Sequence, residues 1–215
     1  CVGVARFEGE SNALSFDSAI RLDHNPAPLV SDDRETLRSD RATFPMAYGA
    51  EDLPDLIRMV KDLATYEKEP DAAVATEDDF RAALFPTGKG ATPMAWCHVA
   101  EAGEGDVLRR DAGASKGRDR QVVGMALWFL TFSTWTGRHG IHLEDLYVEP
   151  RHRGSGLGKE LIAELAAECR ERGYRRLEWT VLRWNAPSIA FYESLGAQPQ
   201  TEWETYRLDG AGLDL

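Results

Sequence analysis

A glycine-rich turn contains the first residues whose spacing suggests chemistry. It reads Arg-His-Arg-Gly-Ser-Gly-Leu-Gly-Lys over residues 151–159 and lies between two apolar, regularly patterned segments. Two phosphate-binding patterns do not fit it. The P-loop fails because the residue five before Gly158 is Arg153, and because Lys159 is followed by Glu160. The dinucleotide pattern G-x-G-x-x-G fails because single residues separate the glycines.

A third pattern, R-x-x-G-x-G, is met by Arg153, Gly156 and Gly158. In such a turn, successive backbone N–H groups point into one cavity at a helix N-terminus, and the missing Cβ atoms let a pyrophosphate approach. The turn therefore predicts a site for a phosphate-bearing ligand, with a solvated basic turn as the alternative. The predicted contacts come from Arg153, Gly154, Ser155, Gly156, Leu157, Gly158 and Lys159, with Arg151 adding positive charge.

Two adjacent acids, Glu144 and Asp145, stand in a segment that predicts a strand. Successive side chains of a strand point to opposite faces, so we expect the two carboxylates on opposite sides of the sheet. One of them either faces a functional site, or is solvated or paired with an arginine at the strand end. The residue types alone leave these alternatives open.

Hydrophobic periodicity predicts the elements that must position these residues. Their order is β-α-α-β-β-β-α-β-α-β, which indicates an α/β protein with a mixed sheet. Residues 1–42 show no sustained period and are expected to form a partly disordered extension, so we place the folded domain at 43–215. The segment 101–120 is expected to be a long flexible connection. Strands are expected at about 43–48, 94–100, 121–132, 141–148, 177–182 and 203–208, and helices at about 51–63, 77–84, 159–172 and 187–195.

Local signals support two of these helices. Thr76-x-x-Asp79 resembles a capping box at the start of the helix at 77–84. The helix at 159–172 has an apolar face that includes Leu161 and Leu165, and Gly173 is expected to end it.

Composition narrows the class of protein. The chain has 215 residues and a net charge of −11, which disfavours nucleic acid as a partner. The longest apolar run, 122–130, is far shorter than the roughly 20 residues of a membrane span, so we expect no membrane partner. Three cysteines without C-x-x-C spacing predict neither a disulfide framework nor a metal centre, and they favour a cytoplasmic location.

Longer segments resemble a known superfamily. Leu-Glu-Asp-Leu-Tyr-Val at 143–148 and Trp-Asn-Ala-Pro-Ser-Ile-Ala-Phe-Tyr at 184–192 flank the turn, and further matches lie at 63–67 and 133–138. Together they resemble the GCN5-related N-acetyltransferase (GNAT) superfamily, and within it the diamine branch of spermidine/spermine and thialysine acetyltransferases. The resemblance covers about 43–208. It implies a central, mostly antiparallel mixed sheet with splayed strands, flanked by helices.

The resemblance also implies an activity. Acetyl-CoA would be the donor, without a metal, and the primary amine of a small molecule would accept the acetyl group directly in a ternary complex. The diamine branch further implies a homodimer. A protein lysine or N-terminal acetyltransferase, and a non-catalytic CoA-binding module, are the alternatives.

Residue roles follow from the resemblance in the same way. Glu144 would take the amine proton, and Tyr192 would protonate the CoA thiolate; a packing role beside Phe191 is the alternative for Tyr192. Asn185 would contact CoA, cap a helix, or do both. The resemblance further implies that the thioester and pantetheine are bound by backbone N–H groups of Leu146, Tyr147 and Val148. It implies that the acceptor is contacted by Tyr66, Glu67, Trp135, Glu144 and Asp145.

Overall fold

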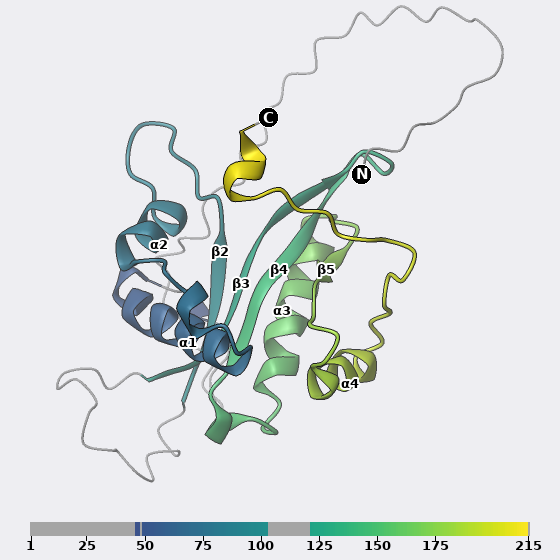
Figure 1. Cartoon of the computed structure of the whole chain (residues 1–215), viewed down its shortest axis with the longest axis horizontal. Coiled ribbons are helices and arrows are strands. Elements are labelled where there is room, and N and C mark those ends of the chain that lie inside the picture. Colours follow the sequence, from purple (N-terminus) through teal and green to yellow (C-terminus); the bar gives the residue numbers. More distant parts are fainter. Residues whose placement is uncertain (1–45, 48, 103–120, 215) are drawn as a thin grey trace, which may run out of the picture.

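The computed structural model describes residues 46–47, 49–102 and 121–214, which form one mixed sheet with helices on both faces (Figure 1). The strand order is β1-β2-β3-β4-β5, antiparallel except for the parallel pair β4–β5. The α/β fold expected from the sequence is confirmed. The strands are β1 Met46–Ala47, β2 Trp96–Glu101, β3 Val122–Ser133, β4 Arg138–Val148 and β5 Leu177–Trp179; the helices are α1 Leu53–Tyr66, α2 Glu77–Leu84, α3 Leu157–Glu171 and α4 Ala186–Ser194.

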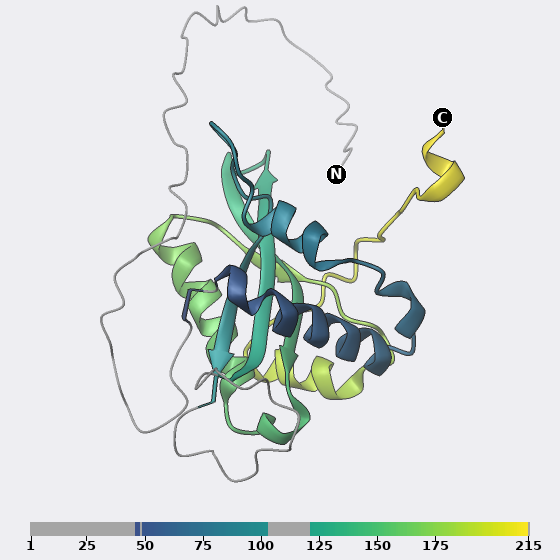
Figure 2. The same cartoon turned by 90° about the vertical axis from the view of Figure 1, so that its left-hand side faces the viewer.

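Two hydrophobic clusters hold the layers together. On one face, α1 and α2 bury Leu53, Leu56 and Leu84 against the sheet. On the other face, α3 buries the apolar stripe predicted for it, which includes Leu161 and Leu165. Figures 1 and 2 show the sheet between these two layers, with α4 near one end of α3. No helix that the structure describes is long and apolar enough to cross a membrane.

Local signals mark several helix ends. Thr76 caps α2 as predicted, because its Oγ accepts a hydrogen bond from the Asp79 N–H at 3.3 Å while the Asp79 carboxylate accepts from the Thr76 N–H at 2.8 Å. Gly173, with φ of 68°, ends α3 in the left-handed conformation that favours glycine. These ends depend on neighbouring residues only, so the sequence predicts them well.

The strand predicted at 203–208 does not form, and β5 is shorter than predicted. Residues 203–208 have no paired strand among the described residues, and Figure 2 shows this segment running away from the sheet. Tyr206 is 93% exposed, and Trp203 and Leu208 are exposed as well. The residue types favour a strand, but the segment pairs neither with the free outer edge of β5 nor with any other strand that the structure describes. The predicted extension 1–42 and most of the connection 101–120 lie outside the described residues.

A histidine is held neutral inside the sheet. The indole N–H of buried Trp128 donates to His98 Nδ1 at 3.0 Å, so this nitrogen must be unprotonated. Burial lowers the pKa of His98 to about 4. The folded protein therefore binds fewer protons than the unfolded chain between about pH 6.5 and pH 4, and stability must fall as the pH drops through this range.

Replacing His98 with Gln should remove this pH dependence, because Gln accepts a hydrogen bond but does not titrate. Between pH 7 and pH 4, the wild type should lose about 3 kcal/mol more unfolding free energy than His98→Gln. Urea denaturation of both proteins at the two pH values measures the difference. Equal losses would show that His98 is not held neutral in the fold.

Candidate active site

Strands β4 and β5 diverge and leave part of β4 open. β4 pairs with β3 as far as Val148, but with β5 only from Ile141 to Leu143. The Glu149 N–H donates to the Val123 carbonyl at 2.9 Å. Polar groups alternate along a strand, so those of Tyr147 also face β3, whereas those of Leu146 and Val148 face the open edge. Two of the three residues predicted to offer backbone groups to a ligand therefore have these groups on the open edge, and their contact with a ligand stays a prediction.

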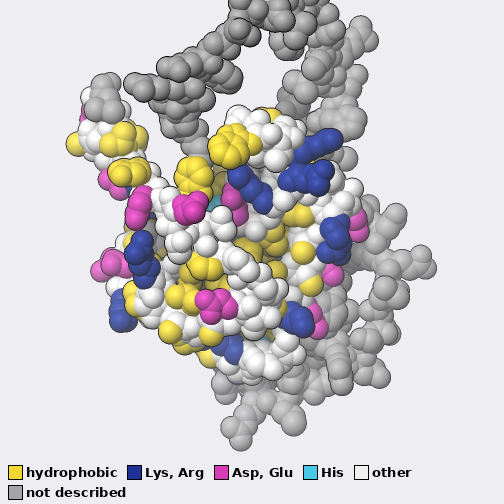
Figure 3. Space-filling view, turned by 90° about the vertical axis from the view of Figure 1, so that its right-hand side faces the viewer, with side chains coloured by type: hydrophobic (Ala, Val, Ile, Leu, Met, Phe, Trp, Pro, Cys, Tyr) yellow, Lys and Arg dark blue, Asp and Glu magenta, His cyan; other side chains and the backbone are white. Residues whose placement is uncertain are grey.

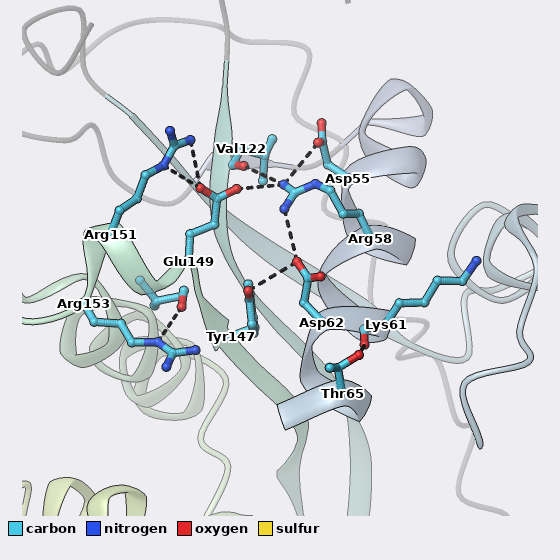
Figure 4. A network of polar contacts seen from close by, with 11 residues as sticks. Asp55, Arg58, Lys61, Asp62, Thr65, Val122, Tyr147, Glu149, Arg151 and Arg153 are labelled. Carbon is cyan, nitrogen blue, oxygen red and sulfur yellow. Dashed lines mark hydrogen bonds and ion pairs between the residues drawn. The ribbon is translucent and has the colours of Figure 1, made fainter. Parts of the chain in front are cut away.

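Tyr147 contributes its side chain instead. Its ring is buried, and its hydroxyl donates to Asp62 on α1 at 3.3 Å (Figure 4). Burial, followed by the charge of Asp62, raises the pKa of Tyr147. The predicted backbone role of this residue is wrong, because the alternation of the strand turns its N–H and C=O toward β3.

The glycine-rich turn adjoins the open edge. Gly154 and Gly156 have φ values of 78° and 103°, which are favourable only for glycine. Ser155 Oγ donates to the His152 carbonyl at 2.6 Å, and α3 begins directly afterwards at Leu157. The first N–H groups of α3 therefore lie beside the open edge of β4, with Arg153 and Lys159 nearby in sequence. This arrangement suits a phosphate group.

A buried carboxylate joins the turn to α1. Glu149 is 8% exposed; its Oε1 pairs with Arg58 of α1 at 3.0 Å, and its Oε2 accepts from Arg151 Nε at 2.9 Å (Figure 4). Arg58 also lies 3.4 Å from Asp55 and 3.5 Å from Asp62. The positive charge of Arg151, which the sequence assigns to the phosphate turn, is thus balanced by Glu149. Sequence reasoning missed this cluster, because Arg58 and Glu149 are far apart in the chain.

Arg153 reaches from the turn toward α1. Its Nε donates to the Val148 carbonyl at 2.9 Å, which satisfies one polar group of the open edge. Its guanidinium carbon lies 5.7 Å from the ring centres of both Tyr66 and Tyr147. Arg153 therefore places a positive charge between the turn and the C-terminal end of α1.

A bulge in β4 places the two adjacent acids. Leu143 pairs with Trp128 and Asp145 with Leu127, so Glu144 is an extra residue in the ladder. Leu143 packs in the cluster with α3, whereas Tyr147 packs in the cluster with α1, so the bulge reverses the alternation. Glu144 Oε2 lies 3.8 Å from His142 Nε2, on the α1 side. The prediction that Glu144 and Asp145 face opposite sides is therefore wrong, because the bulge turns both toward α1.

Ionisable side chains from β4, from α4 and from the end of α1 lie close enough together to shift one another's pKa. Burial, then the charges of Glu144 and Glu67, raises the pKa of Asp145 to about 6. Glu67 follows the last residue of α1, and burial raises its pKa as well. Burial and the charge of Glu67 raise the pKa of Tyr192 on α4. α1, β4 and α4 thus bring together acids that are costly to ionise unless a cation joins them.

The start of α4 is tied to the end of α1. Asn185 is 6% exposed, and its Oδ1 accepts from the Tyr66 hydroxyl at 2.9 Å and from the Ser188 N–H at 3.4 Å. Its predicted role as a helix cap is confirmed, while its contact with a ligand stays a prediction. The Tyr192 ring lies 4.9 Å from Trp179 and 5.3 Å from Phe191 by ring centres, so Tyr192 does pack beside Phe191.

Trp135 lies apart from these residues. It is 87% exposed in the turn between β3 and β4. The hairpin ladder ends at Ser133–Arg138, roughly 20 Å from the position of Asp145 at 3.3–3.4 Å per strand residue. Its predicted contact with an acceptor therefore has no support from this chain's geometry. Among the described residues, no group of three or more His, Cys, Asp or Glu side chains could hold a metal ion.

Comparisons with known proteins identify the family of this chain. The model of the Acetyltransferase (GNAT) family matches residues 74–197. Thialysine N-epsilon-acetyltransferase of Bos taurus is 36% identical over 165 residues, which are 75% of this chain and 89% of that protein. L-ornithine N5-acetyltransferase of Arabidopsis thaliana is 28% identical over 187 residues, with 75% and 82% covered. An integron cassette protein from V. cholerae superposes with a TM-score of 0.59 at 25% identity, over 79% of this chain and 94% of that one. The chain belongs to the acetyltransferase (GNAT) family and is an N-acetyltransferase.

Proposed function

We propose that this N-acetyltransferase uses acetyl-CoA to acetylate a primary amine of a small molecule, such as a lysine-like amino acid, a diamine or a polyamine. One observation carries the proposal. The open edge of β4 has a phosphate-suited turn at one end and the acids Glu67, Glu144 and Asp145 beside it. The relatives named for thialysine and L-ornithine favour a small amine over a protein.

Acetyl-CoA fits the donor side of this site. Its phosphates would meet the N–H groups after Gly156, together with Arg153 and Lys159. Its pantetheine amides and thioester carbonyl would take the polar groups of Leu146 and Val148. Binding would require Arg153 Nε to leave the Val148 carbonyl, which frees its guanidinium for a phosphate.

The acceptor side must remove a proton. An alkyl amine has a pKa of about 10.4, so near pH 7.4 only about one molecule in 10³ is neutral, at a cost of roughly 4 kcal/mol. We propose that Glu144 takes this proton while Asp145 and Glu67 hold the ammonium form. The amine nitrogen then bonds to the thioester carbon. As negative charge develops on the carbonyl oxygen, that oxygen accepts a hydrogen bond from a backbone N–H of the open edge.

The leaving thiolate needs a proton once the carbon–sulfur bond breaks. We propose that the Tyr192 hydroxyl supplies it, since its raised pKa keeps it protonated near neutral pH. The second proton, which the attacking nitrogen loses as the amide forms, then restores the Tyr192 hydroxyl. Buried thiols do not support a covalent route through cysteine: Cys97 and Cys169 are both buried, and burial raises the pKa of each. Direct transfer between the two bound substrates is therefore the favoured sequence.

We also propose that the enzyme is a cytoplasmic homodimer. The free, buried state of Cys97 and Cys169 suits a reducing compartment.

The outer edge of β5 has no neighbour among the described strands, and the 203–208 segment exposes Trp203 and Tyr206. Figure 3 shows apolar side chains across the middle of the face that bears β5, α3 and α4. A second copy would cover such surfaces, and sedimentation equilibrium of the full chain tests this.

The activity itself is tested by CoA release from acetyl-CoA with a panel of lysine, thialysine, ornithine, 1,5-diaminopentane and spermidine. We expect turnover with at least one of these amines. Acetylation of added proteins without turnover of any small amine would contradict the proposed acceptor class, and CoA binding without any turnover would contradict the proposed activity.

Gly156→Asp tests the donor site. The substitution places a negative charge where the phosphates should lie, at a backbone φ of 103°. We expect the acetyl-CoA KM to rise at least tenfold, measured on a variant whose thermal midpoint shows that it folds. Gly156→Ala has the same backbone strain without the charge and serves as the control. Equal effects of the two substitutions would contradict a phosphate at this turn.

Glu144→Gln tests proton removal. Deprotonation of the amine limits the reaction most at low pH, so kcat/KM should fall mainly below pH 8, and a larger share of free amine should restore part of the rate above it. A pH profile of kcat/KM for the amine measures this. Identical profiles for wild type and variant would exclude the role.

Asp145→Asn is the matched comparison for Glu144→Gln, because Glu144 and Asp145 both lie on the α1 side of β4. The Asp145 carboxylate is ionised only above its pKa of about 6, so wild-type kcat/KM should decline as the pH falls through that value. Asp145→Asn should lack this step and keep a raised KM for the amine at every pH. A step near pH 6 that survives in the variant would assign the titration to another group.

Tyr192→Phe tests the general acid. The substitution keeps the ring beside Phe191 and Trp179 and removes only the hydroxyl, so the thermal midpoint should change little. We expect turnover to fall at least 30-fold, because a general acid typically contributes 10² to 10⁴-fold. Wild-type kcat in this variant would leave Tyr192 with a packing role only.

A further inference from the structure

The end of α1 forms an aromatic corner with the segment that precedes α4. The corner consists of the rings of Tyr66 and Trp184, whose centres are 5.9 Å apart and whose planes meet at 43°. The hydrogen bond from the Tyr66 hydroxyl to Asn185 fixes the two sides relative to each other. Figure 2 shows the last turn of α1 beside α4. Both rings remain partly open to solvent, at 38% and 47% exposure.

A lysine of the same chain fills this corner. The Lys68 ammonium lies 4.8 Å from the centre of the Trp184 ring, within the range of a cation–π contact. Lys68 has φ of 68°, and among the described residues it is the one non-glycine residue with a left-handed backbone. It forms no salt bridge with any residue that the structure describes, although Glu67 and Glu69 flank it. In this structure the aromatic corner, rather than a neighbouring acid, therefore holds the primary ammonium group of Lys68.

The aromatic corner lies next to the acids of the site. Glu67, which separates Tyr66 from Lys68, acts electrostatically on both Asp145 and Tyr192. An amine that places its reacting nitrogen near Asp145 would therefore have the corner within reach of its other end. An acceptor with two ammonium groups could bring to the corner the same chemical group, a primary ammonium, that Lys68 places there in this structure.

We propose that the aromatic corner is a subsite for the second, non-reacting ammonium group of the acceptor, and that Lys68 occupies it when the acceptor is absent. The inference rests on the proposed acetylation of small amines. The acceptor must displace the Lys68 ammonium to enter, so Lys68 is an internal competitor that weakens binding of dicationic amines. Trp184 then determines the preference for acceptors with two charges.

Two probes differ only in the second charge: the diamine 1,5-diaminopentane carries two ammonium groups, and the monoamine pentylamine carries one on a chain of the same length. Lys68→Met keeps an unbranched side chain and removes the charge. We expect it to lower both Kd and KM for the diamine at least threefold and to leave both constants for the monoamine within twofold. Trp184→Leu should raise Kd and KM for the diamine at least threefold. Calorimetry in the presence of CoA gives Kd independently of turnover.

The double variant identifies the corner as the shared site. In the Trp184→Leu background, Lys68→Met should give no further gain, because there is no ring left to vacate. Lys61→Met removes an exposed charge from the same helix and is the control for general electrostatics. Equal gains for both amines, additive effects in the double variant, or an equal gain in Lys61→Met would each overturn the proposal.

Failure of the proposed acetylation can be distinguished from failure of the proposed subsite. If neither amine is acetylated by the wild type, calorimetry still reports whether Lys68 and Trp184 control binding of the dication. If both amines are acetylated and Lys68→Met changes neither Kd, the subsite is wrong while the activity stands. Thermal midpoints of all variants confirm that folded proteins are compared.

Discussion

The interruption of β4 at Glu144 is the constraint on which the site depends. Pairing with β5 ends at Leu143, one residue before the bulge, so the polar groups of Leu146 and Val148 have no strand partner in the part of the chain that the structure describes. Unpaired backbone groups are costly when buried, and this chain satisfies one of them through Arg153. The same bulge turns Asp145 and Tyr147 toward α1. One extra residue therefore shapes both the open edge that we propose for the donor and the acidic surface that we propose for the acceptor.

Helix α1, the proposed acceptor wall, is held by polar contacts along its length as well as by its buried apolar face. Arg58 joins it to Glu149 at the end of β4, Asp62 accepts from Tyr147, and Tyr66 donates to Asn185. Figure 4 shows the first two of these contacts in one network. Buried carboxylates such as Glu149 need their partners, so loss of an arginine would leave an uncompensated charge rather than a neutral gap. This requirement fixes Glu67, at the end of the helix, relative to β4.

The sequence predicts what neighbouring residues determine. The capping box at Thr76, the apolar stripe of α3, the left-handed end at Gly173 and the cap at Asn185 all form as predicted. The sequence does not predict the bulge, because no glycine or proline marks it and it exists only in the register with β3. The pairing of Arg58 with Glu149 depends on the fold in the same way. The 203–208 segment has strand-forming residues, but residue types do not say whether a segment will pair with an available edge such as that of β5.

Electrostatics links the two halves of the proposed reaction. Three acids lie together in a chain of net charge −11, and burial, followed by repulsion from Glu144 and Glu67, raises the pKa of Asp145 to about 6. A bound ammonium group would reverse this effect, because it favours the ionised carboxylate. By linkage, a proton on Asp145 and a cationic acceptor therefore compete for the same site. The free site is destabilised by its own charge, and the acceptor that relieves this repulsion is the molecule whose proton must then be removed.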